Sequence, residues 1–209
     1  MQLYSKKVLE HFRNPKNLGE IKNPDGVATV GNPVCGDVMK MYIKVKRKTQ
    51  NSKLKTVEYI EDIKFQTLGC AAAIATSSVV TEMVKGKTLW EAKMIKEGEV
   101  IKSLGGLPKQ KIHCSVLAVR ALKKAIENYE NKKQKNEELK RKVEKVLRRV
   151  KAGIEAHGGG VDIESVKKGV VRLKIKGACI GCPMAKMTFE EGVGKQLKKI
   201  RGVRKVEFK

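Results

Sequence analysis

The stretch "IEDIKFQTLGCAAAIATSSVVTEMVKGK", residues 60–87, joins a strand pattern directly to a helix pattern. Residues 60–68 contain β-branched and aromatic side chains typical of a strand. Residues 71–87 predict a helix that ends at Gly86, because glycine is the usual residue just beyond a helix C-terminus. Cys70 stands at the joint, where the positive end of the helix dipole favours a thiolate.

The rest of the N-terminal half predicts an α+β fold. A short helix is expected over residues 3–13, stopped at Pro15. A second strand is expected over residues 38–46, separated from the first by a polar turn at 49–53. Another helix is predicted to start near Cys114, because apolar side chains recur there at helical spacing, namely Val119, Leu122, Ile126 and Tyr129. Strands first and helices later are typical of the α+β class.

The C-terminal half predicts a smaller α/β module of roughly 70 residues, near the lower limit for an independent core. We divide the chain into a domain at 1–128, a charged linker or helical connector at 129–138, and a second domain at 139–209. The second domain is expected to contain an amphipathic helix, two strands around a turn at 167–169, a second helix and a last strand. Its apolar helix positions are Leu139, Val143, Val146, Leu147, Val150 and Ile154, followed later by Phe189, Val193, Leu197 and Ile200.

The composition is strongly basic, with 46 Lys and Arg residues against 22 Asp and Glu and a formal net charge of +24. This excess suggests an acidic partner such as nucleic acid, or only a solvated lysine-rich surface. Aromatic residues make up 4% of the chain, so the stacking surfaces of single-strand binders are scarce. No apolar run approaches the roughly 18 residues of a membrane span, and no signal-peptide core is seen, so a cytoplasmic protein without membrane contact is expected.

Five cysteines in such a protein favour metal binding or thiol chemistry over a disulfide framework, because their number is odd and the compartment is reducing. Three are well separated: Cys35 in "GNPVCGD", Cys70 in "TLGCAAA" and Cys114 in "KIHCSVL". Asp37 and His113 stand beside two of them, which makes five groups able to bind one metal. The alternative is that these cysteines are small buried core residues.

The other two cysteines, Cys179 and Cys182, form a Cys-x-x-Cys pair in "GACIGCP". Such a pair serves zinc, iron–sulfur clusters or thiol redox chemistry. A thioredoxin-like pair is expected after the first strand of a βαβ unit, whereas this one follows two hairpin strands and opens a helix at Pro183.

The motifs "GNPVCGD", "GCAAAIATSS" and "KIHCSVLAV" resemble the three cysteine motifs of the NifU/IscU-type iron–sulfur cluster scaffold family, over roughly residues 1–128. The resemblance implies a SufE/NifU-like domain with an antiparallel sheet and packed helices. It also implies a transient 2Fe–2S cluster, built from iron and sulfur, on the three cysteines, and zinc can occupy the same site in isolated protein. Residues implied as ligands are Cys35, Asp37, Cys70, His113 and Cys114.

The sulfur donor implied by this resemblance is a cysteine desulfurase, and Cys114 is our expected sulfur acceptor because persulfide transfer needs an accessible thiolate. Cys35 is the alternative acceptor. Family members that depend on a dedicated chaperone carry an "LPPVK"-like peptide, and residues 107–111 here read "LPKQK". A chaperone partner is therefore left open.

Residues 139–209 resemble the C-terminal Nfu domain, with "GGGVDI", "GACIGCP" and the final strand in order. This second resemblance implies a 4Fe–4S cluster on Cys179 and Cys182, shared between two copies of the chain in a homodimer. The ferredoxin-like middle domain of full-length NifU proteins is missing, since no cysteine lies between Cys114 and Cys179.

Together the two resemblances imply a scaffold and carrier that transfers clusters to apo-proteins, rather than an enzyme. Two alternatives remain open at this point. One is a thiol–disulfide oxidoreductase that uses Cys179 and Cys182, and the other is a basic nucleic-acid-binding protein.

Overall fold

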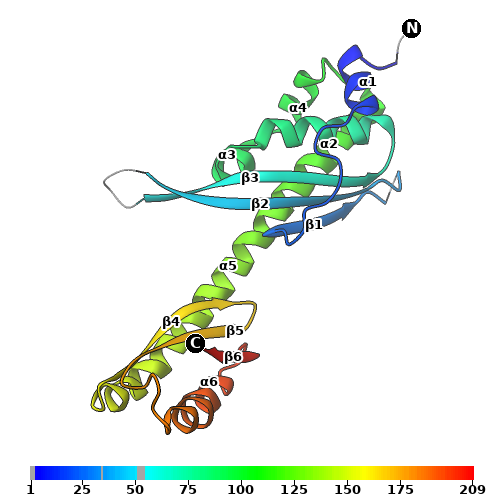
Figure 1. Ribbon diagram of the computed structural model, residues 1–209. Helices are drawn as coiled ribbons and strands as arrows, with labels where there is room; N and C mark the ends of the chain where they lie inside the picture. The colour runs from blue at the N-terminus through cyan, green and yellow to red at the C-terminus, as the bar shows by residue number, and fades with distance from the viewer. Residues whose placement is uncertain (1–2, 34, 51–54) are drawn as a thin grey trace. The chain divides into compact units, whose positions relative to one another are not determined.

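The computed structural model describes residues 3–33, 35–50 and 55–209, and the chain forms two compact units (Figure 1). Unit 1 is Met1–Glu130 and unit 2 is Asn131–Lys209. Each unit has its own three-stranded sheet and its own hydrophobic core. The predicted α+β class is confirmed, with a second, small sheet domain at the C-terminal end.

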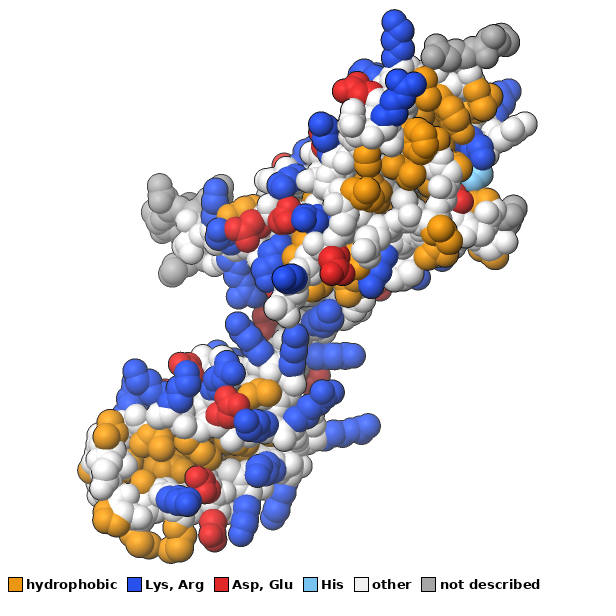
Figure 2. All heavy atoms as spheres, turned by 45° about the vertical axis from the view of Figure 1, so that its right-hand side comes forward, with side chains coloured by type: hydrophobic (Ala, Val, Ile, Leu, Met, Phe, Trp, Pro, Cys, Tyr) orange, Lys and Arg blue, Asp and Glu red, His pale blue; other side chains and the backbone are white. Residues whose placement is uncertain are grey.

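The excess of basic residues extends over both units, as Figure 2 shows for one face. Unit 2 alone has 23 Lys and Arg residues against nine Asp and Glu. Within the described ranges, no helix combines the length and the apolar character needed to cross a membrane.

The sheet of unit 1 contains β1 (Gly26–Gly31), β2 (Val38–Gln50) and β3 (Lys55–Leu68), antiparallel and in that order. The strands predicted at 38–46 and 60–68 are confirmed, and both are longer than expected. The predicted turn at 49–53 is partly wrong, because Thr49 and Gln50 belong to β2, and residues 51–54 lie outside the described residues. β1, a short strand with glycine at both ends, was not predicted.

Five helices and one 3₁₀ turn contribute to unit 1 in its described part: α1 (Lys6–Arg13), α2 (Ala71–Val84), α3 (Leu89–Met94), α4 (Glu97–Ser103), η1 (Lys109–Lys111) and the first part of α5 (Ile112–Glu155). The predicted helices at 3–13 and 71–87 correspond to α1 and α2. Gly86 follows α2 with φ +82°, as a glycine beyond a helix end should. The short helices α3 and α4 were not predicted.

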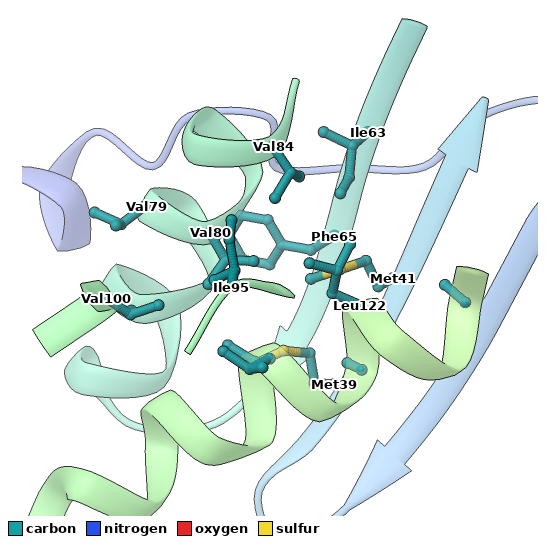
Figure 3. Packing of buried hydrophobic residues seen from close by; sticks show 14 of the residues in the cluster. Met39, Met41, Ile63, Phe65, Val79, Val80, Val84, Ile95, Val100 and Leu122 are labelled. Atoms are coloured by element: carbon teal, nitrogen blue, oxygen red, sulfur yellow. The ribbon is translucent and has the colours of Figure 1, made fainter. Parts of the chain in front are cut away.

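The core of unit 1 lies between the sheet and the helices. Met39 and Met41 of β2 and Phe65 of β3 have no exposed surface, and they face α2 and α5 (Figure 3). α2 is almost wholly buried, and its buried hydroxyls find partners. Ser77 Oγ donates to the Ala73 carbonyl over 2.6 Å, and Ser78 Oγ accepts from the backbone N–H of Lys16 over 2.8 Å. This packing fixes the N-terminus of α2, and Cys70 with it.

α5 runs without interruption through residues 129–138, so this connector is helical. At the end of unit 1 the helix is held by polar contacts. Asn128 Nδ2 donates to the Val27 carbonyl over 2.7 Å, and Tyr129 Oη donates to Glu58 Oε1 over 2.8 Å. Burial raises the pKa of Tyr129 to about 12, with its hydrogen bond to Glu58 as the next cause.

Unit 2 packs the second part of α5 against β4 (Gly159–Lys167), β5 (Val170–Gly177) and β6 (Lys205–Phe208). β4 and β5 form the predicted hairpin, with Lys168 and Gly169 at positive φ in its turn, and β6 pairs parallel to β5. The predicted last helix begins as a π-helix, η2 (Met187–Gly194), and continues as α6 (Lys195–Lys198). Its predicted apolar positions Phe189, Val193 and Leu197 are buried.

Candidate functional site

The three separated cysteines of unit 1 come from three loops that the fold brings to one end of its sheet. Cys35 lies in the loop between β1 and β2, and Asp37 directly precedes β2. Val38 pairs with Leu68 across β2 and β3, so Asp37 lies beside the residues that follow Leu68. Those residues lead into Cys70, the N-cap of α2. The pairing register of β2 and β3 therefore decides that Asp37 lies near Cys70, and the local sequence pattern does not specify that register.

Two overlapping sets of metal-binding groups result. The ligand atoms of Cys35, Asp37 and His113 lie within 4.8 Å of one another, and so do those of Asp37, Cys70 and Cys114. The Sγ atoms of Cys70 and Cys114 are 3.7 Å apart, and Cys114 Sγ donates to Asp37 Oδ2 over 3.8 Å. Asp37 is the member common to both sets. All five residues singled out in the sequence of this half thus lie together.

His113 has a buried ring nitrogen, Nε2, that has no hydrogen-bond partner among the described residues. A buried polar nitrogen left without a partner costs about 1–3 kcal/mol, so such atoms usually serve a specific purpose. Beside Cys35 and Asp37, this imidazole nitrogen has the chemistry of a metal ligand.

The three thiols differ in exposure. Cys35 is exposed, Cys70 is half-buried, and Cys114 has no exposed surface. Burial raises the pKa of the Cys114 thiol well above its ordinary value, and the neighbouring Cys70 and Asp37 raise it further. The expectation that Cys114 is an accessible thiolate is therefore contradicted: although Cys114 lies in the first turn of α5, burial and negative neighbours outweigh the helix dipole.

Two further residues of this site were missed in the sequence. Tyr4 packs against the buried cluster that contains Cys114, and burial raises its pKa, with the charge of Cys70 as the next cause. The negative charge of Cys70 is also the main reason that the pKa of Lys111 is raised. Lys111 ends the "LPKQK" segment two residues before His113, and a cation so close to a predicted ligand pair was the available signal.

Exposed apolar side chains flank the site. Val38 is 39% exposed, Leu68 76% and Ile112 41%, and each lies within two residues of a candidate ligand. Figure 2 shows hydrophobic side chains gathered on the visible face of unit 1. Apolar surface around a polar site is typical of a surface that meets another protein.

The second pair lies where β5 of unit 2 ends. Cys179 is half-buried, with its sulfur against the backbone of Gly159, and Cys182 is exposed. The loop is fixed by backbone hydrogen bonds: Ala178 N donates to the Gly158 carbonyl over 2.9 Å, and Cys182 N donates to the Cys179 carbonyl over 3.4 Å. Among the described residues, no other Cys, His, Asp or Glu lies close enough to these two cysteines to form a set of three metal ligands.

The cysteine loop of unit 2 also carries exposed apolar residues. Ile180 is 71% exposed, and Met184 and Met187 are each 54% exposed. Gly181, between the two cysteines, has φ +85°, a conformation that side chains with a β-carbon rarely adopt. A two-thiol loop with an apolar border is thus presented at the surface of this unit.

An α+β fold that gathers thiols, a carboxylate and an imidazole at the end of a sheet defines a class of protein able to bind a soft metal or metal cluster. Comparison with known proteins agrees with this class. Residues 3–136 match the family model described as "NifU-like N terminal domain", and residues 143–207 match that described as "NifU-like domain". The chain therefore belongs to the NifU-like family, as the cysteine motifs predicted.

The similar proteins include named scaffold proteins. "Iron-sulfur cluster assembly scaffold protein IscU 1" of Archaeoglobus fulgidus is 54% identical over 158 residues, which cover 75% of this chain and 97% of the relative. The IscU scaffold protein of Escherichia coli K12 is 48% identical over 134 residues, covering 63% and 97%. A crystal structure of the N-terminal part of a NifU-like protein from Brucella abortus is 25% identical, with a TM-score of 0.46 over 62% of this chain and 96% of that one.

Proposed function

We propose that this protein is an iron–sulfur cluster assembly scaffold and carrier rather than an enzyme. Its substrates are iron and sulfur, which it assembles on unit 1 and passes as clusters to apo-proteins. The observation that carries this proposal is the pair of overlapping ligand sets around Asp37, from residues of three separate loops. The scaffold function named for its relatives supports it.

The ligand chemistry suits a transient product. Three thiolates from Cys35, Cys70 and Cys114 provide the soft ligands that an iron–sulfur cluster requires. Asp37 or His113 supplies the fourth position, and a carboxylate or imidazole holds iron in such a cluster less firmly than a fourth thiolate would. A 2Fe–2S cluster built there can leave, whereas a closed four-cysteine site would keep it. Zinc can bind the same thiolates when iron and sulfide are lacking.

The exposure of the three thiols favours Cys35 as the point where sulfur enters. A cysteine desulfurase must bring its persulfide to a thiol that it can reach, and Cys35 is exposed whereas Cys114 is buried. The exposed Val38, Leu68 and Ile112 beside the site fit the docking of that protein.

Unit 2 is proposed to receive or store a second cluster, of the 4Fe–4S type, between two copies of the chain. Cys179 and Cys182 supply two thiolates, and a 4Fe–4S cluster takes four. A two-fold axis through this loop would bring together four thiolates and the exposed Ile180, Met184 and Met187 of each copy. We further propose that the functional domains are residues 1–128 and 139–209, with the helical segment 129–138 as connector.

Anaerobic reconstitution tests the scaffold role. The full-length chain is supplied with iron, cysteine and a cysteine desulfurase, and clusters are followed by visible absorption and Mössbauer spectroscopy. The triple variant with serine at Cys35, Cys70 and Cys114 should lose the labile cluster of unit 1. The cluster of unit 2 should still form in this variant when preformed cluster is supplied. Serine at Cys179 and Cys182 is the matched control, which should remove only the second species. If the first triple variant assembles both species at the parent rate, the scaffold proposal is wrong.

The assembly state tests the shared cluster of unit 2. Mass and iron content measured together should show a dimer when this cluster is present and a smaller species after chelation. A monomer that carries a cluster on Cys179 and Cys182 alone would contradict the shared site. Thiol-exchange activity without any cluster chromophore would instead favour the oxidoreductase alternative.

A further inference from the structure

Cys70 and Cys114 form a pre-arranged dithiol within the first site. Their sulfurs are 3.7 Å apart, and a disulfide bond is about 2.05 Å long, so each sulfur needs to move only about 0.8 Å to form one. Both are held by packed elements, Cys70 at the start of α2 and Cys114 in the first turn of α5. The pair also packs against Ala72 and Ala73, which keeps the two loops in contact.

The two thiols differ in how they can be reached. Cys70 is half-buried and Cys114 has no exposed surface, so a sulfur donor can reach the first but not the second. Asp37 Oδ2 lies 3.8 Å from Cys114 Sγ and accepts its hydrogen bond. Asp37 also lies within 4.8 Å of the Cys35 sulfur, so the entry thiol and the pair share this carboxylate. One thiol is thus placed to carry sulfur, and the other lies close enough to attack it.

We propose that Cys114 resolves a persulfide on Cys70, so that this pair supplies the two electrons that convert the delivered sulfur to sulfide. The inference rests on the proposed function, because the sulfur must first be delivered as a persulfide. Cluster assembly needs sulfur as sulfide, whereas a desulfurase hands over sulfur at the oxidation level of a persulfide. A reductant built into the scaffold would make that change at the place where sulfide is used.

Sulfur passes from Cys35 to Cys70 and is then released as sulfide. The Cys70 thiol attacks the terminal sulfur of a Cys35 persulfide, which leaves Cys35 as a thiol and Cys70 as the persulfide. Cys114 Sγ then attacks Cys70 Sγ, the bond to the terminal sulfur breaks, and hydrosulfide leaves. The proton of Cys114 leaves with the hydrosulfide, so hydrogen sulfide is the product. Two thiols are oxidised to one disulfide, and one persulfide sulfur is reduced to sulfide.

The disulfide must be reduced again before these cysteines can bind iron, and an external dithiol or electron donor does so. Sulfide release by one chain therefore stops after a single turnover when no reductant is added. This limit separates the proposal from direct reduction of the persulfide by an outside donor, which would leave Cys70 and Cys114 as thiols.

The test uses a cysteine desulfurase that carries its persulfide and has been freed of cysteine. It is mixed anaerobically, without metal or reductant, with the full-length chain carrying Cys179→Ser and Cys182→Ser, so that the other cysteine pair cannot supply electrons. Released sulfide is trapped and measured, and the chain is analysed by peptide mass spectrometry. We expect sulfide at up to one equivalent per chain, together with a disulfide between the peptides of Cys70 and Cys114. Desulfurase alone is the control for sulfide from its own thiols.

In the same background, Cys114→Ser should keep the extra sulfur atom on Cys70 and lose sulfide release. Cys70→Ser should likewise lose it, with the extra sulfur kept on Cys35, and circular dichroism checks that each variant is folded. A parent chain that keeps its persulfide until dithiothreitol is added would overturn the inference but leave the scaffold proposal standing. A chain that accepts no sulfur at any of the three cysteines would overturn both.

Discussion

Gly69 lies directly against the carboxyl group of Asp37. A β-carbon on Gly69 would lie 3.0 Å from Asp37 Cγ and 3.1 Å from its Oδ1, and 2.9 Å from the β-carbon of Ala73. Real β-carbons hardly ever approach other atoms so closely, so any other residue here must displace Asp37 or the first turn of α2. The candidate fourth ligand therefore depends on a glycine that has no ligand atom of its own.

Gly69→Ala should destabilise unit 1 by about 1–3 kcal/mol, the usual cost of overpacking. It should also weaken metal binding at the first site, because Asp37 and Cys70 are moved from their places. Denaturant unfolding measures the first effect, and titration with cobalt(II), followed by its thiolate absorption, measures the second. Gly98→Ala is the control, since a β-carbon there meets nothing within 4 Å. Unchanged cobalt affinity in Gly69→Ala would show that metal binding by Asp37 does not depend on a glycine at residue 69.

Gly159 supports the second site in a similar way. A β-carbon on Gly159 would overlap the Cys179 sulfur and lie 3.1 Å from Ile154 Cγ2, so Gly159→Ala should push the thiol out of place. We expect this variant to lose the cluster of unit 2 and to assemble the unit 1 cluster normally. Gly160→Ala is the matched control, because its nearest atom is Lys176 Cβ at an ordinary 3.5 Å. If both variants bind the cluster of unit 2 equally well, the contact between Gly159 and the Cys179 sulfur does not have the role proposed for it.

The reactivity of the five cysteines should follow their exposure in the metal-free protein. Cys35 and Cys182 are exposed and should be alkylated first, Cys70 and Cys179 more slowly, and Cys114 last. Cys114 combines full burial with a raised pKa, and both reduce the supply of reachable thiolate. Timed iodoacetamide labelling with peptide mass spectrometry gives the order. Early labelling of Cys114 would contradict its burial and restore it as the entry thiol for sulfur.

Core truncations should show whether the two units are stable independently. Phe65→Ala in unit 1 and Leu173→Ala in unit 2 each remove a side chain with no exposed surface. Expected losses are about 3–5 kcal/mol for the first and about 2–5 kcal/mol for the second. Hydrogen exchange resolved along the chain should place each loss in the unit that carries the substitution. If either variant loses protection equally in both units, the proposed division at 129–138 is wrong.

Much of the fold could be predicted from local pattern. The alternating strands that became β2 and β3, the helix after Cys70, and the β4–β5 hairpin all have a period or a turn that identifies them. β1, α3 and α4 are only six or seven residues long, and such short elements carry too little periodicity to stand out. η2 was expected as an α-helix because its apolar residues fit either hydrogen-bonding pattern.

The sequence by itself determined which residues belong to the candidate sites, because glycine-flanked cysteines in three ordered motifs and one Cys-x-x-Cys pair are local features. Only the tertiary structure decided what each of them can do. The pairing of Val38 with Leu68 brings Asp37 beside Cys70, and the packing of α5 against α2 seals Cys114 while bringing its sulfur to Cys70. Exposure and contact between thiols arise from residues far apart in the chain, whose approach depends on strand register and helix packing. For that reason the motif predicted Cys114 as a ligand, but only the fold showed that its thiol is buried.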